Sequence, residues 1–186
     1  SKIVFSSISC ELIDFKENKN MSNLEGKIII VTGSTQGVGA AIATHCAQQG
    51  AAGLVICGRN KKKGGIVAQS IYQCPIEFVE ADLEKVQDCR KVVHCCDEKF
   101  GRVDGLVNAA ALTSRGTLDE TSVEVWDKIF AIIARAPFLL SQETVKIMRR
   151  EKIPGSIVNI LSICKYCGPE FVCAYSATKG ALATFT

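Results

Sequence analysis

Apolar residues along the chain fall into short runs, separated by longer stretches in which they recur every three or four positions. The short runs are rich in β-branched residues and lack alternating polar positions, which is typical of strands buried on both faces. The longer stretches have the spacing of helices with one apolar face. The predicted strands are Ile28–Thr32, Leu54–Cys57, Ile76–Val79, Leu106–Asn108 and Ser156–Leu161.

Helical segments separate these strands. Strands that alternate with helices form right-handed βαβ units in a parallel sheet that helices cover on both sides. The expected fold class is therefore α/β, with a doubly wound parallel sheet in three α/β/α layers. The predicted helices are Val38–Gln49, one containing Gly65–Gln73, Glu84–Phe100, a long helix over about Ser122–Arg150 that bends near Pro137, and one that begins near Cys173.

The two ends of the chain fit this pattern less well. Residues 1–20 combine a short apolar stretch, broken by serines, with several charges, and no small-residue cleavage site follows. We expect them to be a disordered or non-native lead, with the domain covering 21–186. The last helical segment runs to Thr186 without a Gly or Pro terminator. We therefore expect a sheet of five strands, incomplete at its C-terminal edge and open there.

Composition excludes several other classes of protein. Of the 186 residues, 47% are hydrophobic and 22% are charged, which argues against disorder and against a coiled coil. No apolar run approaches the ~18 residues needed to cross a bilayer. The net charge of +3 is weak, and the one dense basic run, Lys61–Lys63, is typical of a solvated helix start. We expect neither nucleic acid nor membrane as a partner.

Ten cysteines are too few for a disulfide scaffold of this length, and most lie in apolar periodic segments. A reducing compartment, and hence a cytoplasmic location, fits this usage. Cys164 and Cys167 have the spacing of a redox or zinc pair. We favour loop packing for them, because no second such pair exists and both histidines lie in helical patterns. No metal site is predicted.

A glycine-rich turn, Thr32–Gly39, leaves the first predicted strand and opens the first helix. Its strand–turn–helix context is that of a Rossmann nucleotide site, where phosphates sit on free N–H groups at the helix start. Gly33 permits a tight turn, Gly37 lets the backbone approach a pyrophosphate, and Gly39 allows close packing. It is not a P-loop, because no Lys-Ser/Thr follows. The predicted cofactor-binding residues of this turn are Gly33, Thr35, Gln36, Gly37, Val38 and Gly39.

The residue after the second strand distinguishes the two nicotinamide cofactors. An acidic residue there binds the ribose 2′-hydroxyl of NAD, whereas a basic residue pairs with the 2′-phosphate of NADP. This chain has Arg59 at that position and no acid, and arginine can bind a phosphate through two hydrogen bonds. Although Arg59 could also be an ordinary surface residue, we favour NADP(H) over NAD(H).

A second group of residues has the pattern of an acid–base site. Tyr175 and Lys179 are four positions apart and therefore share one helix face. Ser162 ends the fifth strand, at the sheet edge where ligands bind. A nearby ammonium and a positively charged nicotinamide both favour the phenolate form of a tyrosine. Tyr175 could then exchange a proton with the substrate oxygen while Ser162 hydrogen-bonds that oxygen.

Together these motifs resemble the short-chain dehydrogenase/reductase family, and the resemblance extends from about Leu24 to the last residue. It also rests on the segments 81–83 and 106–111. It implies oxidation of an alcohol or reduction of a carbonyl with NAD(P), with Tyr175 as acid/base, Lys179 on the nicotinamide ribose and Ser162 positioning the substrate. Asp82 would face the adenine or cap the next helix. The further cofactor-binding residues that it implies are Leu83, Asn108, Ala109 and Ala110.

The sequence departs from the family pattern at three places. Ala111 replaces a usual glycine, which would be costly if its backbone had a positive φ. Ile133 replaces an asparagine that links the catalytic lysine to solvent through a water, so a site-facing Ile133 would damage proton transfer and a core-facing one would not. Roughly sixty residues of the family, with two strands and a substrate lid, have no counterpart here. The full-length parent is expected to be a homo-oligomer.

Three interpretations follow. The leading one is a carbonyl/alcohol oxidoreductase with a small-molecule substrate. The second is a nucleotide-binding module that has lost turnover or acts as an interaction partner. The third, a methyltransferase of the Rossmann type, leaves the Tyr175–Lys179 pair without a role. Residues 162–171 are expected to line the remaining substrate pocket, whose substrate the sequence does not identify.

Overall fold

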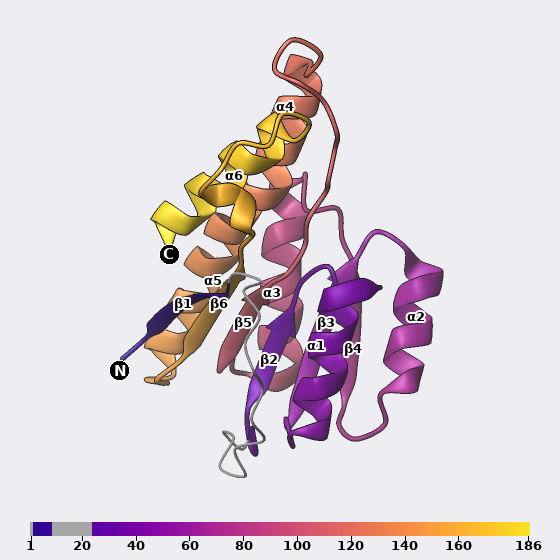
Figure 1. The fold of residues 1–186 in the computed structure, drawn as a ribbon. Coiled ribbons are helices and arrows are strands. Elements are labelled where there is room, and N and C mark those ends of the chain that lie inside the picture. The colour runs from indigo at the N-terminus through magenta and orange to yellow at the C-terminus, as the bar shows by residue number, and fades with distance from the viewer. Residues whose placement is uncertain (1, 9–23) are drawn as a thin grey trace, which may run out of the picture.

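The computed structural model describes residues 2–8 and 24–186, which form one parallel sheet covered by helices (Figure 1). The sheet has six strands in the order β1-β6-β5-β2-β3-β4. Five of them coincide, within a residue or two at each end, with the five predicted strands. The strands are β1 (Val4–Ile8), β2 (Ile28–Val31), β3 (Gly53–Gly58), β4 (Ile76–Glu80), β5 (Gly105–Asn108) and β6 (Ser156–Ile160).

The helices follow the strands as the sequence pattern predicts, and the long predicted helix is divided. A π-helical segment, η1 (Ala131–Arg135), separates α4 from α5, and Pro137 lies in the first turn of α5, directly after that segment. The others are α1 (Gly37–Gln48), α2 (Lys61–Ser70), α3 (Val86–Phe100), α4 (Val123–Phe130), α5 (Ala136–Arg150), α6 (Cys173–Phe185) and the short 3₁₀ helix η2 (Ile163–Lys165).

Helices cover both faces of the sheet. Because successive residues of a strand point to opposite faces, each central strand contributes side chains to two separate cores. Ile28 and Ile30 of β2 join the core formed with α3 and α5, whereas Ile29 and Val31 join the core formed with α1 and α2. In Figure 1, α1 lies on the near face of the sheet and α3 lies behind it. The predicted three-layer α/β/α architecture is confirmed.

The sixth strand corrects the expectation of a five-stranded sheet with an open edge at β6. β1 pairs in parallel with β6, Val4 opposite Ser156, and the Val4 N–H donates to the Gly155 carbonyl at 2.9 Å. The Phe5 ring meets the edge of the Phe185 ring at 6.2 Å between centroids. Residues 4–8 therefore belong to the sheet rather than to a lead outside the fold. Of the predicted lead, residue 1 and residues 9–20 lie outside the described residues.

A buried carboxylate fixes the start of the central strands. The Asp104 side chain is 4% exposed and accepts hydrogen bonds from the Ile28 N–H at 3.0 Å and from Arg102 Nε at 2.9 Å. Burial alone would raise the pKa of Asp104. The hydrogen bonds from Arg102 and Ile28, together with the charges of Arg102 and Lys27, outweigh burial and hold that pKa below its usual range.

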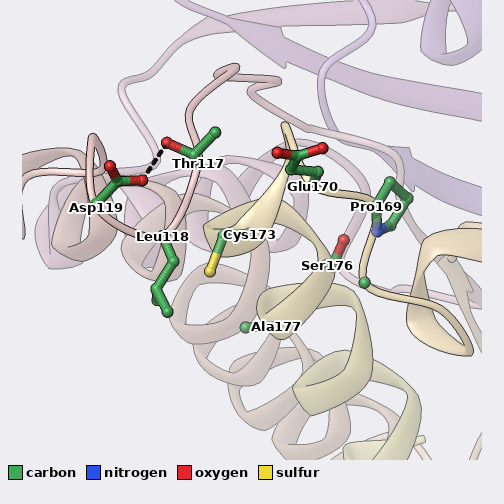
Figure 2. Close-up of a pocket in the computed structure, with 9 residues that line it drawn as sticks. Thr117, Leu118, Asp119, Pro169, Glu170, Cys173, Ser176 and Ala177 are labelled. Carbon is green, nitrogen blue, oxygen red and sulfur yellow. Dashed lines mark hydrogen bonds between the residues drawn. The ribbon is translucent and has the colours of Figure 1, made fainter.

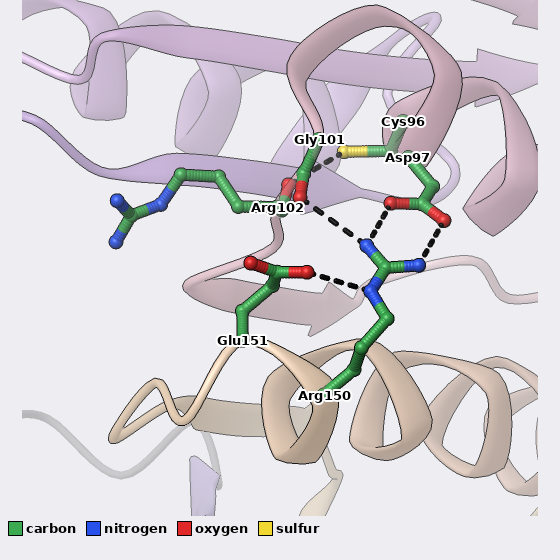
Figure 3. Close-up of polar contacts among 6 residues, drawn as sticks. All are labelled: Cys96, Asp97, Gly101, Arg102, Arg150 and Glu151. Atoms are coloured by element: carbon green, nitrogen blue, oxygen red, sulfur yellow. Dashed lines mark hydrogen bonds and ion pairs between the residues drawn. The ribbon is translucent and has the colours of Figure 1, made fainter.

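Arg150 connects the ends of α3 and α5 (Figure 3). Its guanidinium donates to both carboxylate oxygens of Asp97, at 2.8 and 2.6 Å, and its Nε donates to Glu151 at 2.6 Å. The bidentate hydrogen bond holds the pKa of Asp97 below its usual range. This fork fixes how the two helices lie against each other on the far face of the sheet.

The cysteines of the described part are free thiols, and several of them pack in the core as predicted. Burial raises the pKa of the Cys57 thiol to about 12 and that of Cys89 to about 11. Cys173 at the start of α6 is only partly buried. Among residues 2–8 and 24–186, no helix is long and apolar enough to span a membrane.

Candidate nucleotide-binding and catalytic site

The strand order places a ligand crevice between β2 and β5. From β2 the chain continues to β3 and β4 on one side, and then crosses to β5 and β6 on the other side. Neighbouring strands whose connections depart in opposite directions leave a crevice at their carboxyl ends, where nucleotides bind in this architecture. The glycine turn follows β2 and residues 109–112 follow β5, so both loops meet at this crevice.

The three glycines of the turn for which the sequence predicts roles differ in φ and in what a Cβ at each would meet. Gly33 has a φ of +65°, and a Cβ there would lie 2.5 Å from the Ala110 Cα. Gly37 has a φ of +57°, with nothing within 4 Å of a Cβ, and it lines the crevice. Gly39 packs against the turn itself, because a Cβ there would lie 2.5 Å from the Gly33 carbonyl oxygen. Gly33 and Gly39 thus pack against neighbouring backbone, whereas the space beside Gly37 is open to the crevice.

Two hydroxyl groups that the sequence reasoning missed hold the turn in place. The Thr32 Oγ1 accepts hydrogen bonds from the N–H groups of Ala109 at 3.1 Å and Ala110 at 3.2 Å, which joins the two loops. The Ser34 Oγ donates to Val31 O at 2.6 Å and accepts from the Cys57 N–H at 3.0 Å. Both residues are buried, and their position next to Gly33 was the only signal in the sequence.

The crevice has a volume of about 320 Å³. Its walls include nearly all of the residues predicted to bind the cofactor. Asn108 is an exception, because it is buried and its amide donates to the Asn159 side chain at 2.8 Å. The predicted residues that do line the crevice are Gly33, Thr35, Gln36, Gly37, Val38, Gly39, Arg59, Asp82, Leu83, Ala109 and Ala110.

Arg59 stands at the end of β3, where the crevice continues into a second hollow. Lys61 and Lys63, from the first turn of α2, line this hollow beside Arg59 and Gln36. The Lys63 ammonium donates to the Gln36 side-chain oxygen at 2.7 Å. The lysine run does start a helix as predicted, and two of its members also face this hollow, which sequence reasoning missed.

Asp82 follows β4 and lines the crevice, and its carboxylate accepts a hydrogen bond from the Glu84 N–H at 3.2 Å. The cap of α3 falls at Lys85, so of the two roles considered for Asp82 the structure does not show the helix cap. Asp82 stabilises the turn that precedes the helix.

The residues that line the crevice do not include the three predicted catalytic residues, Ser162, Tyr175 and Lys179, which lie after β6 and on α6. Ser162 follows β6, and its hydroxyl accepts from the Cys164 N–H at 3.3 Å. Lys179 is 3% exposed, and its ammonium donates to the Ile160 carbonyl at 2.5 Å and lies 5.6 Å from the centre of the Tyr175 ring. Burial lowers the pKa of Lys179 to about 8.

The structure also locates two of the departures from the family pattern. Ile133 is fully buried in an apolar cluster with Leu161 and Leu182, against which Tyr175 packs. It therefore faces the core, and the neighbouring Ile132 lines the crevice. Ala111 is not in a left-handed conformation: of the described residues other than glycine, only Lys152 has a positive φ. The backbone cost expected for Ala111 does not arise.

These residues fit a dinucleotide. The open space above Gly37, the helix start beside it and the basic hollow at Arg59 provide room, N–H groups and positive charge for phosphates. Among the described histidine, cysteine and acidic side chains, no group of three could hold a metal ion.

Comparison with known proteins agrees with this geometry. The family model for short chain dehydrogenases matches residues 27–186. An uncharacterized oxidoreductase of Thermotoga maritima is 35% identical over 166 residues, which cover 88% of this chain and 64% of that protein. An NADP-dependent (R)-specific alcohol dehydrogenase of Lentilactobacillus kefiri is 33% identical over 160 residues, which cover 86% and 63%.

A solved structure shares the fold. The crystal structure of a blue fluorescent protein from a metagenomic library, in complex with NADPH, aligns with a TM-score of 0.81 at 29% identity, over 89% of this chain and 68% of that one. The present chain thus spans a little under two thirds of the length of the two sequence relatives. With the family match and the crevice in agreement, the chain belongs to the short-chain dehydrogenase/reductase family of Rossmann-fold oxidoreductases.

Proposed function

We propose that this protein interconverts a carbonyl and a secondary alcohol with a nicotinamide cofactor, and that it prefers NADP(H). One observation carries the proposal: the nucleotide crevice and the apolar cluster behind Tyr175 are continuous. Ile132 and Leu112 line the crevice; Ile132 belongs to the cluster, and Leu112 and Tyr175 both pack against that cluster. A substrate beside Tyr175 would therefore lie next to the nicotinamide end of the crevice.

In this proposal Tyr175 exchanges a proton with the substrate oxygen, while Ser162 hydrogen-bonds that oxygen and holds it in place. A nicotinamide cofactor, when bound, supplies or accepts the hydride. Lys179 shares the helix face of Tyr175, and with a pKa of about 8 it is mostly protonated at neutral pH. Its ammonium lies 5.6 Å from the centre of the Tyr175 ring. The Ile160 carbonyl holds that ammonium at a fixed place in the sheet.

The preference for NADP(H) rests on the hollow beyond Arg59. Three cationic side chains, Arg59, Lys61 and Lys63, line it, and none of the side chains that line it is acidic. A 2′-hydroxyl would find no carboxylate there, whereas a 2′-phosphate would find a guanidinium and ammonium groups. Lys63 already reaches across the hollow to Gln36, so a phosphate would replace a neutral acceptor with a charged one.

Binding measurements test the cofactor preference separately from catalysis. NADPH and NADH are titrated by fluorescence into the wild-type chain and into Arg59→Ala, Lys63→Ala and Lys62→Ala; the last is the matched control, because Lys62 does not line the hollow. We expect NADPH to lose about tenfold in affinity in each of the first two variants, since each removes one charged contact to a phosphate. NADH affinity and the Lys62→Ala variant should change little. Equal loss for both cofactors would contradict the preference.

Turnover tests the reaction. NADPH-dependent reduction of a panel of ketones and aldehydes is measured with this chain and with a version extended to the length of its relatives, each beside Tyr175→Phe. The proposal requires turnover that Tyr175→Phe lowers by about 10²–10⁴-fold while NADPH affinity is kept. If the extended chain binds NADPH and stays inert, the protein is a nucleotide-binding module. If no nucleotide binds, both interpretations fail.

A further inference from the structure

The turn that follows Ser162 carries two cysteines three positions apart, Cys164 and Cys167. Cys57 and Cys96 are buried in the core, whereas Cys164 is partly buried and Cys167 is exposed. Among the residues that the structure describes, no group of three histidine, cysteine or acidic side chains could hold a metal ion, so the pair lacks the further ligands that zinc requires. The two residues together provide a dithiol outside the core.

The backbone of this turn brings the two cysteines within the range of a disulfide. The Lys165 N–H donates to the Ser162 carbonyl at 3.1 Å, and Tyr166, directly after η2, has a φ of −98° and a ψ of −22°. Lys165 and Tyr166 are the two residues between the cysteines, and their conformation is that of a type I turn. The Cα atoms at the two ends of such a turn are less than about 7 Å apart. A disulfide joins residues whose Cα atoms are roughly 4.4–6.8 Å apart.

The Cys167 thiol points back along the turn. Its Sγ donates to the carbonyl of Ile163, the residue directly before Cys164, at 3.7 Å. Side chains three positions apart on a 3₁₀ turn lie one above the other, so Cys164 and Cys167 share one face of this turn. The two sulfur atoms can therefore meet by rotation about side-chain bonds, without unfolding of the turn.

The same turn holds the serine of the proposed active site. The Ser162 hydroxyl accepts a hydrogen bond from the Cys164 N–H at 3.3 Å, and the Ser162 carbonyl accepts the one from Lys165. A bond between the two sulfur atoms would pull the ends of the turn together and shift the Cys164 N–H, so the Ser162 hydroxyl would change its position. Neither Ser162 nor the two cysteines line the nucleotide crevice.

We propose that hydrogen peroxide converts Cys164 and Cys167 into a reversible disulfide, which moves Ser162 and slows the reaction. The Cys167 thiol attacks one peroxide oxygen, the O–O bond breaks, and a sulfenic acid and one water form. The Cys164 thiol then attacks that sulfur, the S–O bond breaks, and the oxygen leaves as a second water with the thiol proton. The two thiols lose two electrons and two protons to the peroxide, and a dithiol reductant returns them. The disulfide rests on the turn alone, whereas its effect on turnover rests on the proposed function.

Cys173 provides a matched control from the same stretch of chain. It is partly buried, as Cys164 is, and it begins α6. Figure 2 shows its sulfur among the side chains that line a hollow of about 510 Å³ between residues 117–119 and 168–170. Cys173 thus lies outside the turn that holds the pair, and its removal should leave the disulfide intact.

Mass spectrometry locates the disulfide. The 186-residue chain is treated with hydrogen peroxide, its remaining thiols are alkylated, and trypsin cleaves after Lys165, between the two cysteines. Peptide 153–165 should then be joined to peptide 166–179 in wild type and in Cys173→Ser but not in Cys167→Ser, and dithiothreitol should separate the two peptides. Absence of the joined peptides in wild type, their persistence in Cys167→Ser, or their presence only in a covalent dimer overturns the proposal.

Two further measurements test the effect on Ser162. In amide NMR spectra, oxidation should shift the resonances of residues 162–167 and leave those of residues 33–39 and the NADPH affinity unchanged, because the turn lies outside the crevice. In the extended chain, oxidation should lower kcat by about tenfold or more in wild type and change it little in Cys167→Ser. A disulfide that leaves the Ser162 resonance unchanged, or that leaves kcat unchanged in a chain that turns over, overturns the proposal. An extended chain without turnover counts against the proposed function instead, and the NMR spectra then decide.

Discussion

Two glycines of the same turn should respond to alanine in different ways. Gly33 and Gly37 both have a positive φ, +65° and +57° respectively, so alanine at either position adopts a left-handed backbone. That conformation costs about 1–2 kcal/mol for an L-residue, and the smaller freedom of alanine in the unfolded chain returns roughly 0.4–1 kcal/mol. By this term alone, each substitution should lower the free energy of unfolding by about 1 kcal/mol.

The surroundings of the two glycines separate them. A Cβ at Gly33 would lie 2.5 Å from the Ala110 Cα and 2.9 Å from the Ala110 backbone N, whereas a Cβ at Gly37 would meet nothing within 4 Å. Backbone atoms cannot move aside as a side chain can, so Gly33→Ala should cost a further 1–3 kcal/mol, roughly, as overpacking does. The total decrease in the free energy of unfolding is about 2–4 kcal/mol for Gly33→Ala and about 1 kcal/mol for Gly37→Ala.

Binding should show the opposite order. The methyl group of Gly37→Ala would stand in the space where a phosphate is expected, so NADPH affinity should fall by about tenfold or more in a chain that remains folded. Urea unfolding followed by circular dichroism gives the stabilities, and NADPH fluorescence gives the affinities. Equal destabilisation by the two variants, or unchanged NADPH binding in Gly37→Ala, would refute the assignment of one glycine to packing and the other to the ligand.

Three further predictions concern stability. The buried Lys179 has a pKa of about 8 in the folded state, below its unfolded value of 10.5. Between these two values the folded state binds fewer protons than the unfolded state. The free energy of unfolding should therefore rise by up to about 3 kcal/mol as the pH rises from 8 to 10.5. Urea unfolding at pH 7.5 and pH 10 should show that difference between wild type and Lys179→Met, and identical pH profiles would contradict it. Asp104 has a lowered pKa, so its contribution is present above pH ~4 and is lost as the pH falls through the folded pKa; Asp104→Asn should be less stable at pH 7 and flatter in acid, as measured by thermal unfolding. The Ser6 N–H lies two residues after that of Val4 and therefore faces β6, so Ser6→Pro removes a donor from the β1–β6 ladder. Ser6→Pro should lower the free energy of unfolding by about 1–3 kcal/mol, whereas Ser6→Ala should change it little. Equal effects of the two variants would show that β1 does not pair with β6.

The sequence predicted the central strands because their burial leaves a simple pattern. β2 and β3 lie within the sheet and are covered on both faces, so nearly every position is apolar. β1 shows why the edge was missed. Its Val4 and Phe5 are exposed at 46% and 38%, and its one partner strand, β6, lies about 150 residues away in the sequence. Its place depends on contacts such as Phe5 with Phe185, which no local pattern reports.

The site was predicted best where chemistry requires one residue type at a fixed spacing. Gly33 and Gly39 of the turn are of this kind, because a Cβ at either would meet neighbouring backbone. Lys63 was missed because a lysine at a helix start is usually solvated, and its side chain meets Gln36 only when α2 packs beside the glycine turn. Asn108 was assigned to the cofactor by resemblance, whereas its amide is held by Asn159, directly opposite it in the β5–β6 ladder. The local sequence pattern does not tell which residues lie opposite each other in two strands that are far apart in the sequence.

The helix that carries Tyr175 packs against α4 and η1 and is also tied to the strand before it by two polar side-chain contacts. No side chain caps the start of α6. Instead, Lys179 donates to the Ile160 carbonyl of β6, and the Asn159 amide of the same strand donates to the Thr186 hydroxyl at 2.9 Å, at the end of the helix. Two polar contacts from adjacent residues of one strand thus fix α6 at its middle and at its end. A substitution that shifts β6 should therefore move Tyr175 together with Ser162 relative to the nucleotide crevice, even though it touches neither residue.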